Sequence, residues 1–543
     1  MVTKSQSIRH TVILLFVSGL LLLSSLDKIE LHLMEARNFI SAREMVQNDE
    51  YLLTTLNNQP RYEKPPLPTW LTAVAGMTFG FDSLFAMRLP VVAITMLLIL
   101  VFYNFSKILG LEPKHALQNG LILITSFHIF ISGRDNQWDM YTHSMMMGSI
   151  LFLCKLLQEE SHPWRNSLLA GLFLGLSILS KGPVSMYALL LPFLISYGIV
   201  YHVPFRKKWT YLTGMLISGL LLGASWYVYV RIKDPETFQM IASRETSNWL
   251  IYRVKPFYYY WHFFLQSGLW AIPSLIALCY PYLKSRVINI KAYRFALIWT
   301  LLGLFLVSVI PEKKDRYLVP VLIPLALTAG FYIEYLFRSF NSGMVKWEKN
   351  VVYFSSGFIA LIGIAYPFVL IFFLKGKFIN HWFLCFSSSL LVIGCAVFIV
   401  KGLLKYNFSS IFYSSISLFT VAVIAILPLL DEVVYNPHYA SASRARLFEK
   451  ENNVKSYTLS PLVPQIIWDF GKPVPVLEKK GDRVCLPVEK QFAMIVDLKD
   501  SPKLTNIFPQ YEIKKIYQIN INSNKKMEGG LVKDYYFVSK ISE

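Results

Sequence analysis

Residues 10–26 read HTVILLFVSGLLLLSSL, and two charged segments follow this run, EARNFISAREM at 35–45 and RYEKPPL at 61–67. The apolar run is long enough to cross a bilayer and lacks a small-residue cleavage site, so we expect a retained anchor. Charge beside a membrane boundary, in a chain that is otherwise apolar, requires a chemical or ligand-binding explanation. The first loop, residues 27–87, is therefore the first candidate for a functional site.

The composition of the whole chain is that of a polytopic membrane protein. Of its 543 residues, 54% are hydrophobic and only 16% are charged, whereas soluble proteins average roughly 25% charged residues. The net charge of +19 is high, but short inner loops carry Lys and Arg to fix topology, so we expect no nucleic-acid partner.

Thirteen apolar segments are long enough to be candidate membrane spans. They cover residues 10–26, 88–108, 115–133, 140–157, 165–180, 184–201, 210–231, 259–283, 293–311, 317–337, 350–374, 380–400 and 408–430. With the N-terminus inside, every inner loop is then basic, as the positive-inside rule requires. The apolar segment 67–80 is shorter and proline-rich at its start, so we expect a helix at the interface there.

The segment after residue 430 is polar and differs from the rest of the chain. Helix-like stretches at 443–451 and 464–470 alternate with short apolar runs near 492–497 and 536–539. This alternation predicts a small α/β domain, and an odd number of spans places it outside the membrane. We expect an all-α transmembrane domain over 1–430, including the loop 27–87, and an extracytoplasmic α/β domain over 431–543.

Several basic residues fall on the predicted outer side, against the positive-inside rule. They are Arg134, Lys181, Arg253, Lys255, Lys313, Lys314 and Arg316. Long side chains at helix ends can simply extend to the interface. As a set beside acidic residues, they favour a fixed anionic partner such as a lipid phosphate.

The first loop carries the sharpest candidate site. Pro65 and Pro66 make the chain rigid directly after Glu63 and Lys64, so Lys64 is well placed to meet a phosphate. Glu63 either binds a divalent metal or positions Lys64. Glu35, close to the membrane, is a candidate base or ligand; the alternative for this segment is a solvated helix with internal ion pairs.

Further candidates lie at the ends of later spans. Asp139 opens the fourth span and is either a helix cap or a catalytic carboxylate. Arg316 and Tyr317 together form a plausible phosphate clamp, and Glu245 lies in an outer loop. Nucleotide-binding and soluble-hydrolase motifs are missing from the sequence, and the inner loops are too short for a nucleotide site. A sugar donor would therefore be lipid-linked and reached from the outer leaflet.

Taken together, these segments resemble the aminoarabinose transferases, integral-membrane GT-C glycosyltransferases in the family that includes protein O-mannosyltransferases. The resemblance is carried by ARN and AREM in 36–45, YEKPPLP at 62–68, Arg88-Leu-Pro, Trp138-Asp139-Met140, Ser180-Lys181-Gly182 and Arg316-Tyr317-Leu-Val-Pro. It implies thirteen spans and an outer-face cavity. It also implies transfer of a sugar from undecaprenyl phosphate to lipid A, at the periplasmic face of a bacterial inner membrane.

The resemblance also implies residue roles. Glu63 matches a metal position, and Glu245 falls where the family has a histidine, so one zinc-like divalent metal is a candidate cofactor and a nucleotide is not expected. The family's Asp-Glu pair reads Met34-Glu35 here, which leaves Glu35 and Asp139 as the candidate catalytic carboxylates. The candidate donor-phosphate ligands are Arg37, Lys64, Arg134, Arg253, Lys313, Arg316 and Tyr317.

Three functions stay open at this point: transfer to lipid A, the same chemistry with a protein or polysaccharide acceptor, and transport of a lipid-linked sugar. Transporters often show internal repeats and charges near mid-span. Here the charges gather at outer span ends, which favours an enzyme. A phosphate acceptor needs no strong base, whereas a hydroxyl acceptor would need Glu35 or Asp139 as its base.

Overall fold

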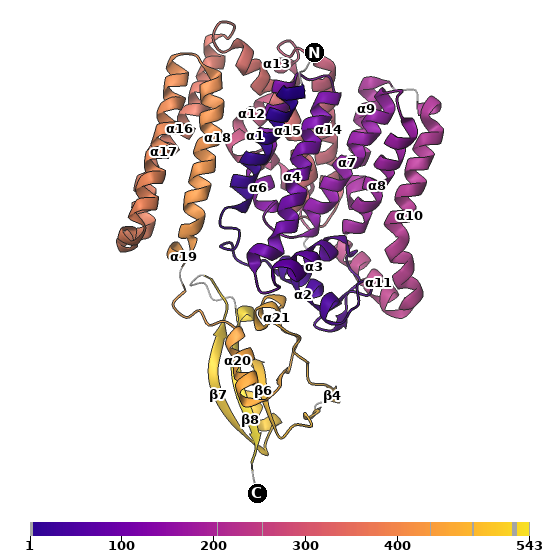
Figure 1. Ribbon diagram of the computed structural model, residues 1–543, viewed down its shortest axis with the longest axis vertical. Coiled ribbons are helices and arrows are strands. Elements are labelled where there is room, and N and C mark those ends of the chain that lie inside the picture. Colours follow the sequence, from indigo (N-terminus) through magenta and orange to yellow (C-terminus); the bar gives the residue numbers. More distant parts are fainter. Residues whose placement is uncertain are drawn as a thin grey trace. The chain divides into compact units, whose positions relative to one another are not determined.

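The computed structural model describes residues 4–202, 205–251, 254–434, 436–480, 483–523 and 529–541. The chain divides into two compact units (Figure 1). The membrane unit comprises residues 1–26, 62–68 and 88–428, and the tail unit comprises 27–61, 69–87 and 429–543. The change of unit at 428/429 lies next to the expected boundary at 430, and most of the first loop clusters with the tail.

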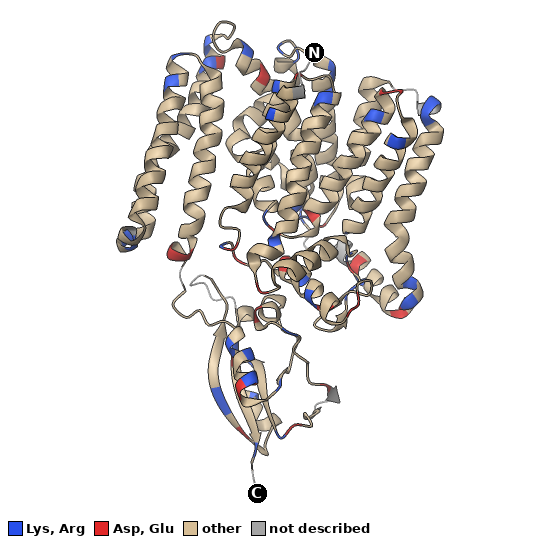
Figure 2. Cartoon of the chain, viewed as in Figure 1, with Lys and Arg blue, Asp and Glu red and all other residues tan. Residues whose placement is uncertain are grey.

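The membrane unit is built of helices. Within the described residues, eight helices are long and apolar enough to cross a membrane. They are α1 (Lys4–Leu23), α4 (Leu84–Ile108), α10 (Trp209–Lys233), α14 (Ile290–Val309), α15 (Val319–Ser339), α16 (Lys346–Leu374), α17 (Trp382–Leu404) and α18 (Phe408–Ile426). In this unit, Lys and Arg gather at the helix ends nearest the N-terminus, as the positive-inside rule predicts (Figure 2).

The other five predicted spans are interrupted or more polar, so the count of thirteen stays a prediction. Two helices, α7 (Trp138–Gln158) and α8 (Pro163–Lys181), are continuous. The remaining three spans are broken into shorter elements: α5 (Pro113–Ile124) with α6 (Phe127–Ser132), η1 (Met186–Leu190) with α9 (Leu191–Tyr201), and η3 (Phe257–Tyr260), η4 (Phe263–Trp270), α12 (Ala271–Ala277) and α13 (Tyr280–Leu283). Apolar composition does not reveal such breaks. At Gly268 the break needs a positive φ of 57°, which glycine adopts without strain.

Two short helices and a hairpin make up most of the first loop. The helices are α2 (Leu33–Gln47) and α3 (Leu67–Phe79), and strands β1 (Thr55–Leu56) and β2 (Gln59–Pro60) lie between them. With 13 residues, α3 is too short to span a bilayer, which agrees with the prediction of a non-spanning helix. Asn38 of α2 is hydrogen-bonded to Thr72 of α3 at 3.1 Å, so the two helices are tied together.

The predicted C-terminal α/β fold is confirmed. A four-stranded sheet has the order β3-β6-β8-β7, in which β3 (Ser456–Thr458) is parallel to β6 (Gln491–Asp497). Strands β8 (Val532–Lys540) and β7 (Tyr511–Asn520) complete the sheet in antiparallel fashion. The predicted helices are α20 (Ser443–Asn452) and α21 (Pro464–Phe470), while two short strands, β4 (Lys479–Lys480) and β5 (Arg483–Val484), form a separate pair.

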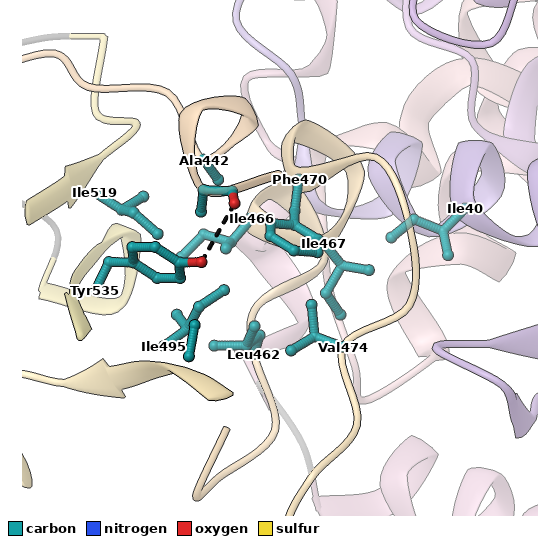
Figure 3. Packing of buried hydrophobic residues seen from close by; sticks show 12 residues of the cluster. Ile40, Ala442, Leu462, Ile466, Ile467, Phe470, Val474, Ile495, Ile519 and Tyr535 are labelled. Carbon is teal, nitrogen blue, oxygen red and sulfur yellow. Dashed lines mark hydrogen bonds between the residues drawn. The ribbon is translucent and has the colours of Figure 1, made fainter. Parts of the chain in front are cut away.

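One hydrophobic core of the tail unit includes a residue of the first loop. Ile40 of α2 is fully buried among residues of α21 and the sheet, including Ile466, Phe470 and Ile495 (Figure 3). The Arg43 guanidinium donates to the last carbonyls of α21, at 3.2 Å from the Ile467 oxygen. The Ile467 carbonyl also accepts from the Gly471 N–H at 3.2 Å, and Arg43 donates to the Trp468 carbonyl at 3.3 Å, so Arg43 adds donors to the C-terminal end of α21.

Candidate active site

A buried charge cluster joins three elements of the membrane unit. Asp139 lies in the first turn of α7, and its carboxylate accepts a hydrogen bond from the ammonium of Lys181, the last residue of α8. The Arg316 Nε lies 3.7 Å from the other carboxylate oxygen, and its Nη1 donates to Gln137 at 2.7 Å. Because Asp139 and Lys181 are both largely buried, each depends on the other for charge compensation.

The backbone after Lys181 explains why the ammonium of this residue lies at the end of a helix. Helix α8 ends at Lys181, and the next residue, Gly182, has φ 75° and ψ −161°, a conformation that suits glycine. Pro183 follows and cannot continue the helix hydrogen-bonding pattern. The chain therefore turns sharply, and Lys181 lies at the helix end rather than inside a longer span.

A cavity of about 600 Å³ opens beside this cluster. Most of its wall is apolar, with Val184, Met186, Ala188, Val307 and Ile310 among the contributors. The ionisable and hydroxyl-bearing residues that line it are Glu63, Lys64, Asp139, His143, Lys181, Tyr187, Tyr227, Glu245, Glu312 and Tyr317. An apolar cavity with a few convergent polar groups is the common form of a ligand site.

The rigid turn predicted at residues 62–66 forms one side of the cavity. Three successive side chains of this turn contact α11 (Pro235–Ile251) or the residue that precedes it. The Tyr62 hydroxyl donates to Asp234 at 3.0 Å, Glu63 pairs with Arg244 at 2.7 Å, and Lys64 pairs with Glu245 at 3.1 Å. Lys64 and Glu245, both predicted from sequence, are thus brought together across 181 residues.

Tyr317, in the short helix η5 (Asp315–Leu318), forms the other side. Its hydroxyl donates to Glu312 at 2.9 Å, and Glu312 also pairs with the Lys314 ammonium. The Lys181 Nζ lies 5.3 Å from the Tyr317 ring centroid, so the phenol and the buried ammonium are neighbours. The Tyr260 phenol fixes the backbone of Lys314 by donating to its carbonyl at 2.9 Å and accepting from its N–H at 3.0 Å.

Three residues of this site were not assigned a role from the sequence. Lys181 was named in the set of outer basic residues and in the Ser180-Lys181-Gly182 motif of the resemblance, but was not placed among the site residues, and Glu312 was not singled out. His143 lies one helical turn after Asp139, lines the cavity and is hydrogen-bonded to Ser185 at 3.0 Å. Its i+4 spacing from Asp139 is the signal that would have identified it.

The remaining predicted site residues are not among the described residues that line the cavity. Glu35 and Arg37 are on α2 of the tail unit, where Glu35 is fully buried and the Arg37 Nη1 lies 3.7 Å from the Met34 sulfur. Arg253 lies outside the described residues.

Arg134 and Lys313 are engaged with backbone carbonyls. Arg134 is buried and donates to the carbonyls of Leu21, Leu22, Ser24 and Ser25, at and just beyond the C-terminal end of α1. Lys313 donates to Ser308 at 2.9 Å and to Ile310 at 2.5 Å. Burial lowers the pKa of Lys313. Neither side chain is among the described residues that line the cavity, so their contacts favour a role in holding helix ends.

The side chains expected to hold a metal do not form a suitable set. Glu63 and Glu245 are each paired with a cation. Within the described part of the chain, no group of three or more His, Cys, Asp or Glu residues is close enough to hold an ion. Zinc sites use three or four such ligands, so the residues present do not fit a metal, and we assign it no step.

Sequence comparisons find a family model and several relatives of this chain. A family model described as dolichyl-phosphate-mannose-protein mannosyltransferase matches residues 63–228, which include the Glu63–Lys64 turn and the Asp139–Lys181 pair. An uncharacterized protein of Aquifex aeolicus is 22% identical, with 83% of this chain and 86% of that protein covered. The undecaprenyl phosphate-alpha-4-amino-4-deoxy-L-arabinose arabinosyl transferase of Pseudomonas aeruginosa (strain UCBPP-PA14) is 26% identical over 56% of each chain. This chain thus spans about half the length of the arabinosyl transferases it matches.

Solved structures extend the likeness over the whole chain. The crystal structure of ArnT from Cupriavidus metallidurans in the apo state superposes with a TM-score of 0.71 at 16% identity, covering 98% of this chain and 97% of that chain. The same protein bound to undecaprenyl phosphate gives a TM-score of 0.70 at 17% identity, covering 99% and 98%. The expected GT-C fold is confirmed.

Proposed function

We propose that this chain, an integral-membrane protein of the GT-C glycosyltransferase fold that resembles the aminoarabinose transferases, moves a sugar from undecaprenyl phosphate to lipid A. The reaction would take place at the periplasmic face of a bacterial inner membrane. One observation carries the proposal: the cavity places Lys64, Lys181 and Tyr317 together within mostly apolar walls. Apolar walls suit a prenyl chain, and two ammonium groups with a phenol suit its phosphate.

The charges of the cavity wall occur as ion pairs. Among the described lining residues, four carry carboxylates, namely Glu63, Asp139, Glu245 and Glu312, and these are paired with Arg244, Lys181, Lys64 and Lys314, respectively. The choice of an amino sugar rests on the likeness to the aminoarabinose transferases. The carboxylates of the wall offer hydrogen-bond acceptors for a protonated sugar amine.

The chemistry is an inverting displacement at the anomeric carbon. An acceptor oxygen forms the new bond to this carbon while the bond to the phosphate oxygen breaks, and the electron pair leaves with undecaprenyl phosphate. Lys64 and Tyr317 stabilise the charge that develops on this leaving group. Asp139 is held by Lys181 and Arg316, which supports a role in organising cations and fits an anionic phosphate acceptor that needs no base.

The test combines cells and purified protein. Lipid A from cells with and without the gene is compared by mass spectrometry, and transfer is then measured in lipid nanodiscs with the undecaprenyl-phosphate-linked amino sugar. We expect a lipid A species heavier by one amino sugar, only when the gene is present. The mannosyltransferase family match makes a protein acceptor the second candidate. Sugar on membrane proteins with unmodified lipid A would favour it.

A further inference from the structure

Glu312 is a buried acidic residue in the wall of a cavity that we assign to an anionic ligand. Its side chain is 8% exposed. It accepts a hydrogen bond from Tyr317 at 2.9 Å and pairs with Lys314. Its backbone is also fixed, because residue 312 forms an isolated antiparallel bridge with Val254. A carboxylate held in this way is a built feature of the site, and its negative charge opposes phosphate binding.

The Tyr317 hydroxyl has one proton to donate. In this structure it donates that proton to Glu312. Three cations surround the ring, with Lys181, Lys314 and Arg316 at 5.3, 5.7 and 5.9 Å from its centroid. A phosphate drawn to these cations would need the same hydroxyl proton, so Glu312 and the phosphate are alternative acceptors for one donor.

We propose that Glu312 competes with the lipid phosphate for the Tyr317 hydroxyl, and so sets how tightly the cavity holds its polyprenyl phosphate product. This inference rests on the proposed function of the same cavity. When the phosphate leaves, the carboxylate accepts the hydrogen bond of the Tyr317 hydroxyl, which stabilises the empty site and favours release. Glu312 is a positioning residue, because it acts through Tyr317 and touches no reacting atom.

The test is a double-mutant cycle on binding, with undecaprenyl phosphate as the probe and the full-length protein in nanodiscs. Glu312→Gln keeps the shape of the side chain, but a neutral amide oxygen accepts more weakly than a carboxylate. We expect this variant to bind undecaprenyl phosphate about tenfold more tightly. Tyr317→Phe should bind more weakly, and in that background Glu312→Gln should change Kd by less than about twofold.

Steady-state kinetics give a second test. If Glu312 had only a structural role, its substitution would not change kcat, KM and product inhibition in the pattern expected here. With slower product release, Glu312→Gln should lower kcat, lower KM for the donor and increase inhibition by added undecaprenyl phosphate. Glu312→Asp keeps the charge but shortens the reach to Tyr317. This variant should also bind the phosphate more tightly than the wild type. If Glu312→Gln does not fold, Glu312→Asp replaces it in the binding experiment.

Two results would overturn the inference. One is unchanged or weaker binding by both Glu312 variants. The other is a gain from Glu312→Gln that persists in the Tyr317→Phe background, which would leave only general charge repulsion. Failure of the proposed function looks different. If the cavity does not take the donor, the wild-type protein would bind undecaprenyl phosphate no better than nanodiscs without protein, and if only the acceptor is wrong, lipid A would stay unmodified while the Glu312 variants still change the Kd.

Discussion

The carboxylate of Asp139, in the first turn of α7, is hydrogen-bonded to the ammonium of Lys181, the last residue of α8. Their side chains are 7% and 8% exposed. The two charges thus fix the ends of neighbouring helices at one point, and that point is the wall of the cavity.

Breaking this pair should destabilise the protein. Asp139→Asn leaves Lys181 and Arg316 without their shared counter-charge, and removal of one partner from a buried pair typically costs about 3–5 kcal/mol. The double variant Asp139→Asn with Lys181→Met should lose less than the sum of the single losses, as measured by unfolding of the purified protein in detergent. The control is Lys28→Ala, which removes a more exposed ion pair with Asp431 and should cost less than about 1 kcal/mol. Additive losses from Asp139 and Lys181 would show that the pair is not coupled.

Lys64→Ala should remove most transfer activity while the protein still folds. A charge-assisted contact to a phosphate is worth about 1.5–3 kcal/mol, which corresponds to roughly a tenfold to hundredfold loss in kcat/KM. The matched control is Lys405→Ala, since Lys405 is exposed and lies in a loop predicted on the inner side. Near-normal transfer by Lys64→Ala would leave the Lys64–Glu245 pair as a purely structural contact.

Glu35→Gln tests whether the reaction needs a base. For a phosphate acceptor we expect a modest loss of transfer and an unchanged pH profile, because an anionic oxygen attacks without losing a proton. General-base catalysis is worth roughly 10²–10⁴-fold. A loss beyond about a thousandfold with a flattened pH profile would instead point to a hydroxyl acceptor.

Chelation tests the metal that the family resemblance implies. Because Glu63 and Glu245 are each neutralised by a cation, we expect full transfer after treatment with EDTA and less than one equivalent of bound zinc by elemental analysis. Glu245→His offers a comparison, since it restores the residue type of the family. Loss of activity on chelation, recovered by added zinc, would establish a metal site despite these ion pairs.

The tail unit should lose stability in acid. Burial opposes the charged form of Asp497, but hydrogen bonds from Lys533 and Ser460 outweigh it and hold the pKa of Asp497 below its ordinary value of 3.8. Asp534 has its pKa lowered in the same way, by Lys515 and Gln518 against the effect of burial. A carboxyl group with a lowered pKa in the folded state stabilises the fold above 3.8 and loses this contribution as the pH falls further.

Hydrogen exchange of β6 and β8 peptides in the full-length protein measures this loss. After correction for intrinsic exchange rates, protection should fall as the pH drops below 3.8. Asp497→Asn should have lower protection at neutral pH and a flatter dependence on pH. Constant protection down to the lowest pH would contradict the assigned ion pairs.

The sequence predicted those parts of the molecule that depend on local pattern. The long apolar helices, the short α3, and the helices and strands of the tail follow from periodicity, proline placement and composition. The turn at Glu63–Lys64 was found because two prolines mark a rigid backbone. The span at 115–133 is interrupted between α5 and α6, and a run of apolar residues does not encode where a helix breaks.

Contacts between side chains that are far apart in the chain could not be predicted from the sequence. Asp139 and Lys181 are 42 residues apart, and single-sequence patterns do not say which helix ends meet. Arg134 and Lys313 looked like anion ligands because they are cations on the outer side, yet buried backbone carbonyls also need donors and engage both.

The burial of Ile40 in the core of the tail has a consequence for biosynthesis. The Arg43 guanidinium and the Trp468 carbonyl that it contacts are 425 residues apart. At about 5–20 residues per second, a ribosome needs roughly 20–85 s to make the intervening chain. During that time α2 has left the ribosome with its apolar face uncovered, so the first loop can complete its fold only after the residues that pack against Ile40, within 442–535, have been made. In this interval the uncovered apolar face of α2 would be available to a chaperone.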